Sequence, residues 1–113
     1  MMINKIGPSF RGLKIRQDDN TPFRLEMFLD NHYKKRVFDA AVATMNKTAS
    51  KQDVFLSLSP QTEKDSLQEI VIYDDKNYGL VRIFVEDKPT LMDLIQSFSL
   101  LNTLLKNNLN SKQ

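Results

Sequence analysis

The stretch from Pro89 to Leu109 constrains the fold more than any other part of the sequence. Its apolar residues recur at three- and four-residue intervals and form one stripe of a helix, made of Leu91, Leu94, Ile95, Phe98, Leu101, Leu105 and Leu109. Thr90 and Asp93 have the spacing of a capping box, and Pro89 marks the boundary before it. A helix over residues 89–109 would be about 31 Å long, enough to cross a small sheet.

Alternating apolar and polar residues predict the strands of that sheet. Asp53–Ser59 alternates Val54, Leu56 and Leu58 with Phe55 and Ser57. Two further runs, Glu69–Asp74 and Tyr78–Glu86, flank a turn at residues 75–77 and predict a hairpin.

The N-terminal half predicts a similar arrangement. Phe10–Gln17 and Phe23–Asp30 are expected to be strands, joined by a turn at residues 18–21, with Pro22 at the start of the second strand. Residues 33–49 repeat apolar groups at helical spacing, so we expect a helix there. Ser59 and Pro60 predict a short helical segment over residues 59–67.

These elements predict a two-layer α+β fold. We expect one domain over residues 1–113, a mostly antiparallel sheet of about five strands, and loosely ordered tails at 1–9 and 107–113. When Asp18 is aligned with Asp74, Asp19 falls on Asp75 and Phe28 on Phe84. The order of elements therefore suggests a ββα-β-ββα pseudo-repeat.

Composition excludes several chemistries. The chain has no cysteine, which rules out disulfides, thiol nucleophiles and cysteine-ligated zinc. His32 is the only histidine, and no serine lies in a nucleophile-elbow motif. Adjacent carboxylates such as Asp74 and Asp75 point to opposite faces of a strand and fit turn chemistry better than metal binding. We therefore predict a non-enzymatic protein with no cofactor and no metal.

The sequence also bears on location. The first ten residues show no export signal, and the apolar C-terminal stretch is interrupted by Asp93, Asn102 and Lys106, so we expect no membrane span and a cytoplasmic protein. Residues 1–51 hold ten Lys and Arg against five Asp and Glu, whereas residues 52–113 hold six against nine. The N-terminal half is therefore the basic half, which hints at an anionic partner or a head-to-tail contact between copies.

One sheet face has unusual chemistry. We expect one face of the sheet to pack against the helices with the apolar residues of each alternation, namely Leu13, Ile15, Leu25, Met27, Leu29, the alternate residues of 54–58 and those of 81–85. The other face then gathers aromatic rings and cations. Its predicted members are Phe10, Lys14, Arg16, Arg24, Phe28, Phe55, Ser57, Arg82 and Phe84, with Glu26 and Glu86 among them. An exposed patch of this kind usually marks an interaction surface.

Three interpretations of this face remain open. The rings and cations would suit single-stranded DNA or RNA, with Lys34, Lys35, Arg36, Lys47 and Lys51 extending the basic track. Alternatively, the face or the last helix binds another protein or a second copy, since Leu100 and Leu104 lie off the core stripe. In the third interpretation, another segment of the chain covers the phenylalanines.

Overall fold

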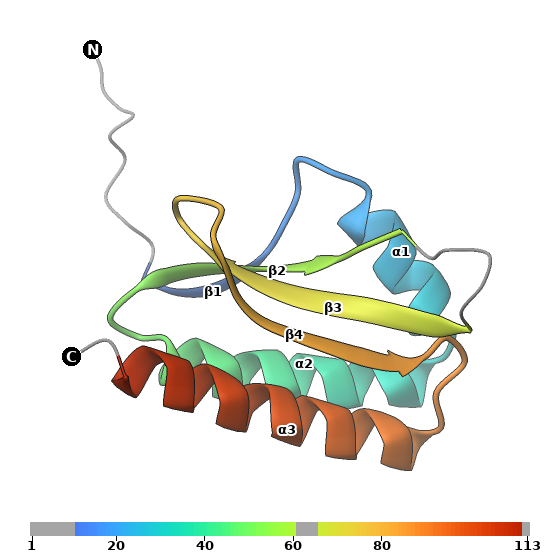
Figure 1. Cartoon of the computed structure of the whole chain (residues 1–113). Helices are drawn as coiled ribbons and strands as arrows, with labels where there is room; N and C mark the ends of the chain where they lie inside the picture. Colours follow the sequence, from blue (N-terminus) through green and yellow to red (C-terminus); the bar gives the residue numbers. More distant parts are fainter. Residues whose placement is uncertain (1–10, 61–65, 112–113) are drawn as a thin grey trace.

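The computed structural model describes residues 11–60 and 66–111 and has the element order β-α-α-β-β-β-α (Figure 1). Its strands are β1 (Gly12–Ile15), β2 (Asp53–Leu58), β3 (Leu67–Asp74) and β4 (Gly79–Glu86). Its helices are α1 (Thr21–Phe28), α2 (His32–Thr48) and α3 (Leu91–Asn110). The predicted α+β class is confirmed, with four strands where about five were expected.

The strands form one mixed sheet in the order β1-β2-β3-β4. β1 runs parallel to β2, whereas β2–β3 and β3–β4 are antiparallel. The predicted hairpin of β3 and β4 is confirmed, with Ile70 opposite Ile83 and Ile72 opposite Val81. Both isoleucines join the core and Val71 faces the opposite way, which fixes the phase that alternation alone left undecided.

α2 and α3 lie side by side under one face of the sheet, as Figure 1 shows. The core between the layers takes the predicted inward residues of β1, β2 and β4, and five buried residues of α3, namely Leu94, Phe98, Leu101, Leu105 and Leu109. Phe38 of α2 and Phe98 of α3 meet edge to face, with ring centroids 5.5 Å apart. Full burial of each large apolar side chain contributes about 1.5–3 kcal/mol relative to exposure.

The prediction of a strand over Phe23–Asp30 is wrong, because this segment contains α1. Leu25 and Phe28, three positions apart, point into the core, while Phe23 and Met27 are exposed. Met27 therefore does not face the sheet interior as expected. Since β1 leads into two helices and then pairs in parallel with β2, there is no N-terminal hairpin, and the ββα-β-ββα pseudo-repeat is also wrong.

The helix predictions over residues 33–49 and 89–109 agree with the structure. α2 begins after Asn31, whose side chain accepts a hydrogen bond from the Lys34 amide at 3.0 Å. The capping box at α3 is present, with Thr90 and Asp93 bonded reciprocally at 3.0 Å. α3 continues to Asn110, so residues 107–110 are helical and not a loose tail. The predicted helical segment at 59–67 overlaps residues 61–65, which lie outside the described residues, as do residues 1–10.

Candidate functional site

The face of the sheet opposite α2 and α3, here called the open face, carries much of the predicted patch. Strand pairing arranges its side chains in rows of Lys14, Phe55 and Tyr73, then Ser57, Val71 and Arg82, then Glu69 and Phe84. Phe84 is 58% exposed, Phe55 and Tyr73 are half-buried, and Ser57 and Val71 are buried. Phe84 is thus the most accessible ring of the open face among the described residues.

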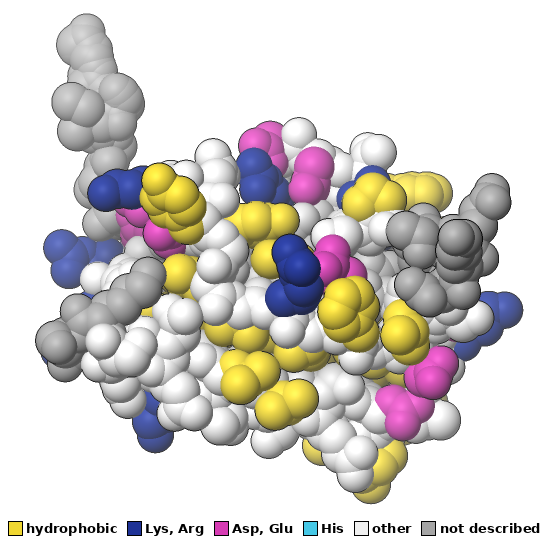
Figure 2. Space-filling model, in the orientation of Figure 1, with side chains coloured by type: hydrophobic (Ala, Val, Ile, Leu, Met, Phe, Trp, Pro, Cys, Tyr) yellow, Lys and Arg dark blue, Asp and Glu magenta, His cyan; other side chains and the backbone are white. Residues whose placement is uncertain are grey.

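Carboxylates neutralise the two arginines of this face. Arg82 Nε lies 2.8 Å from Glu69 Oε2 on the neighbouring strand. Arg16 Nε lies 2.7 Å from Asp18 Oδ1 and 4.0 Å from Asp19 Oδ2, and its guanidinium lies 5.4 Å from the centroid of the Tyr73 ring. The hydrogen bond to Asp18 raises the pKa of Arg16, and the same bond lowers the pKa of Asp18. Figure 2 accordingly shows dark blue, magenta and yellow groups interspersed, with no continuous basic track on the visible side.

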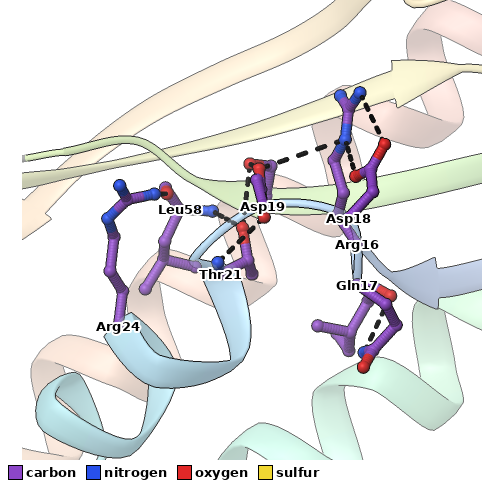
Figure 3. A network of polar contacts seen from close by, with 9 residues as sticks. Arg16, Gln17, Asp18, Asp19, Thr21, Arg24 and Leu58 are labelled. Atoms are coloured by element: carbon purple, nitrogen blue, oxygen red, sulfur yellow. Dashed lines mark hydrogen bonds and ion pairs between the residues drawn. The ribbon is translucent and has the colours of Figure 1, made fainter.

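A buried relay of hydrogen bonds holds α1 against β2 (Figure 3). The Leu58 amide donates to Thr21 Oγ1 at 3.2 Å, and the hydroxyls of Thr21 and Ser57 are 3.0 Å apart. Ser57 Oγ then donates to Asp19 Oδ2 at 3.1 Å. The relay satisfies two buried hydroxyls and one strand amide. Ser57 therefore has a structural role, because its hydroxyl is hydrogen-bonded to Thr21 and Asp19.

Two predicted members of the face lie elsewhere because α1 is helical. Phe28 is only 4% exposed and belongs to the core. Arg24 Nη1 donates to the Leu58 carbonyl at 2.8 Å, next to the Thr21 relay, so it ties α1 to the end of β2. Glu26 likewise lies on α1 and not on the sheet. Phe10 lies outside the described residues.

The predicted basic track does not adjoin the open face. Lys34, Lys35 and Arg36 lie in the first turns of α2, which packs against the opposite side of the sheet. Lys34 Nζ also forms an ion pair with Asp30 Oδ1 at 3.0 Å. Lys47 lies in the last turn of α2, and Lys51 follows the helix. The structure therefore brings Lys14, Arg16, Phe55, Arg82 and Phe84 to one face of the sheet, whereas Lys34, Lys35, Arg36 and Lys47 lie on α2, which covers the other face.

The sequence did not identify the most distinctive feature, which is the outer edge of β4. Within the described ranges, no strand pairs with this edge. The Asp87 amide donates to the Ser66 carbonyl at 2.9 Å, so the backbone groups of Asp87, Val85, Ile83 and Val81 turn toward β3. Because this orientation alternates, Arg82, Phe84 and Glu86 turn their amides and carbonyls outward.

One flank of α3 lies alongside this edge. Asn108 Nδ2 donates to the Leu80 carbonyl at 3.0 Å, which shows that this flank faces the start of β4. Leu104 and Leu100 precede Asn108 at four-residue spacing and share its flank. Leu100 is 51% exposed, whereas Leu104 packs partly against the core. Ser99 and Asn102, on the other flank, line a groove with α2.

The remaining predictions about chemistry concern His32, metals and membranes. His32 is exposed at the start of α2, with its ring edge-on to Tyr33 at 5.7 Å between centroids. Across residues 11–60 and 66–111, no group of three His, Asp or Glu side chains is placed to hold a metal ion. None of the helices in these ranges combines the length and the apolar character needed to cross a membrane.

Comparisons with known proteins yield no relative. No family model matches the chain, and no curated protein or solved structure matches significantly.

Proposed function

We propose that this protein is a non-enzymatic protein-association module that binds a partner strand along the outer edge of β4. The observation that carries the proposal is the row of outward backbone groups at Arg82, Phe84 and Glu86, unpaired within the described part of the chain. An extended segment from a partner can bond to such a row and add a strand to the sheet.

The composition of β4 supports this role. Natural edge strands are commonly short, or carry proline, inward-pointing charge or other charged side chains, especially lysine, which discourage pairing. β4 has eight residues, GLVRIFVE, with neither proline nor lysine, and its two charged residues, Arg82 and Glu86, have opposite signs. Val81, Ile83 and Val85 face the core without interruption, and Phe84 provides an exposed ring for a partner. The exposed Leu100 beside the edge enlarges the apolar contact.

A library of random ten-residue peptides displayed on phage tests this proposal. We expect binders that lose affinity for Phe84→Pro, because proline removes an outward amide. Phe84→Val is the matched control, since it removes the ring and keeps the amide. Peptides that bind wild type and both variants equally, or an absence of binders when the protein is monomeric and its β4 edge is therefore free, would contradict the proposal. Circular dichroism must show that each variant folds.

Single-stranded nucleic acid on the open face is the second candidate function. Phe55, Tyr73 and Phe84 supply rings, and Lys14, Arg16 and Arg82 supply positive charge on the same face. We rank it second because Arg16 and Arg82 are already paired with carboxylates. For either function we propose a cytoplasmic location, with which the absence of cysteine is compatible.

A further inference from the structure

We infer that the strand added to β4 is β4 of a second copy of this chain, antiparallel and centred on Phe84. This inference rests on the proposed function, because it assigns the partner of the same edge. It follows from two features of the described residues that are independent of each other, the charges along β4 and the position of Leu100 on α3.

The charges along β4 are complementary to themselves in one register. If a two-fold axis passes through Phe84, Arg82 of each copy lies opposite Glu86 of the other, and Phe84 lies opposite Phe84. Both charge pairs are then attractive, and the two rings meet at the centre. On the core side, Ile83 of each copy lies opposite Val85 of the other. Arg82 has room for this contact, since its side chain is 66% exposed while paired with Glu69.

Neighbouring registers are less favourable. An axis through Arg82 would place two arginines opposite each other, and an axis through Glu86 would do the same with two glutamates. An axis through Ile83 would place Glu86 opposite the apolar Leu80 and leave its charge without a partner, and an axis through Val85 would place Arg82 opposite Lys88. The register centred on Phe84 also uses the residues whose backbone groups point outward, so each opposed pair of Arg82, Phe84 and Glu86 can exchange hydrogen bonds.

The position of Leu100 agrees with the same axis. Asn108 lies at the level of Leu80, because the two are hydrogen-bonded. From Leu80 to Phe84 the strand advances four residues, about 13 Å. α3 runs back along β4 after the loop at residues 87–90, as Figure 1 shows, and the eight residues from Asn108 to Leu100 span about 12 Å. Leu100 therefore lies at the level of Phe84, where the axis brings it next to Leu100 of the second copy.

The spacing of strands and helices allows the β4–β4 pairing and the contact between the two Leu100 side chains to form together. Adjacent strands lie about 4.8 Å apart and packed helices about 8–10 Å apart, so two helices cover four strands. A continuous sheet of eight strands keeps this ratio and sets the two α3 helices side by side. The contact is isologous, as in most two-fold dimers, and it covers the exposed Phe84 and Leu100 of both copies.

A charge-swap experiment tests the inference. We expect wild-type protein to have a mass of about 26 kDa in light scattering, twice the 13.1 kDa of one chain. Glu86→Arg and Arg82→Glu should each weaken dimerisation about tenfold, because two attractive pairs become repulsive. An equimolar mixture of the two variants should form a heterodimer, since all four opposed charges are then complementary. A mixture no tighter than either variant alone would overturn the register.

Cross-linking gives a readout that does not depend on Arg82→Glu folding well. The chain has no cysteine, so one introduced thiol can form only an intermolecular disulfide. Phe84→Cys places the two thiols on the axis, with α-carbons about 5.5 Å apart, within disulfide range. Tyr78→Cys, exposed in the turn before β4, is the matched control. We expect cross-linking of the first variant on mild oxidation and little of the second.

The outcomes separate the inference from the proposed function. A monomer at high micromolar concentration, or equal cross-linking of both cysteine variants, overturns the inference. If peptides from the library still bind wild type and fail to bind Phe84→Pro, the association function stands and its partner is a different protein. If the protein is monomeric and no peptide binds, both fail.

Discussion

Gly12 passes so close to Asn46 that a β-carbon at position 12 would overlap the side-chain oxygen of Asn46. That oxygen accepts the Leu13 amide at 2.9 Å, so α2 holds the first residues of β1 in place. Gly12 also has φ of 135°, a conformation that side-chain-bearing residues rarely adopt. One glycine thus meets a steric and a conformational requirement together.

We predict that Gly12→Ala destabilises the protein by at least about 2 kcal/mol, because the new methyl group adds backbone strain and displaces Asn46. Urea unfolding monitored by circular dichroism measures the change. Gly79→Ala is the matched control, since a β-carbon there would meet only a Val71 methyl group at 3.9 Å. Equal loss of stability in the two variants would contradict the role given to Asn46.

The relay between α1 and β2 gives a second prediction. Thr21→Val keeps the shape of the side chain but leaves the Leu58 amide and the Ser57 hydroxyl short of a partner in a buried place. We expect a loss of about 1–3 kcal/mol in the free energy of unfolding. Thr103→Val, on the exposed side of α3, should change it by less than about 0.5 kcal/mol. A neutral Thr21→Val would show that α1 is held by its apolar residues alone.

Asp19 should make stability depend on acid pH. Burial raises the pKa of its carboxyl, but hydrogen bonds from Thr21 and Ser57 and the charge of Arg16 outweigh burial and lower the pKa below its ordinary 3.8. A carboxyl with a lowered folded pKa stabilises the fold above its unfolded pKa. That contribution is lost as the pH falls through the folded value.

We therefore predict that Asp19→Asn is less stable than wild type near neutral pH, by about 1 kcal/mol after allowance for partial exposure. The difference should shrink as the pH falls below about 4. Urea unfolding at a series of pH values measures it, with Asp39→Asn on the exposed side of α2 as control. A difference that does not change with pH would mean that the charge of Asp19 plays no part.

Local pattern predicted most elements, and α1 shows where it failed. In TPFRLEMF, apolar residues alternate, but Leu25 and Phe28 are also one helical turn apart. No β-branched residue follows Thr21, and Arg, Leu, Glu and Met favour helices. Pro22 in the first turn fits a helix start as well as a strand start. Propensity and proline position could have identified the helix, whereas alternation over eight residues could not decide.

The candidate site was predicted only in part, for a topological reason. Side-chain alternation along β4 correctly placed Arg82 and Phe84 opposite the core, and helical spacing singled out Leu100. Which strand lies at the edge depends on strand order, and the parallel pairing of β1 with β2 through α1 and α2 sets that order. Ion pairs such as Arg82–Glu69 depend on strand register, which the local sequence pattern does not reveal.

Nucleic-acid binding by the open face has a direct test. If it occurs, a fluorescent single-stranded oligonucleotide should bind more weakly as the salt concentration rises. Phe84→Ala should weaken binding by about 1–3 kcal/mol, and Arg82→Ala by about 1 kcal/mol. Arg36→Ala, on α2 and away from this face, is the control. No binding at low salt, or equal effects of Arg82→Ala and Arg36→Ala, would remove this candidate.

A substitution at Leu100 tests the contribution of α3 to the dimer independently of the β4 edge. Leu100→Glu places a charge where the two α3 helices meet on the axis, so both copies would bury like charges side by side. We expect the dimer to dissociate at concentrations at which wild type is dimeric, as measured by sedimentation velocity. Ile95→Glu is the matched control, because Ile95 is similarly exposed on α3, at 49%, but lies on the opposite flank, which lines the groove with α2. Phe84 and Leu100 lie at the same position along β4, next to the two-fold axis. If Phe84→Pro abolished the dimer but Leu100→Glu did not, the strand pairing would stand, and the inferred contact between the two α3 helices would be wrong.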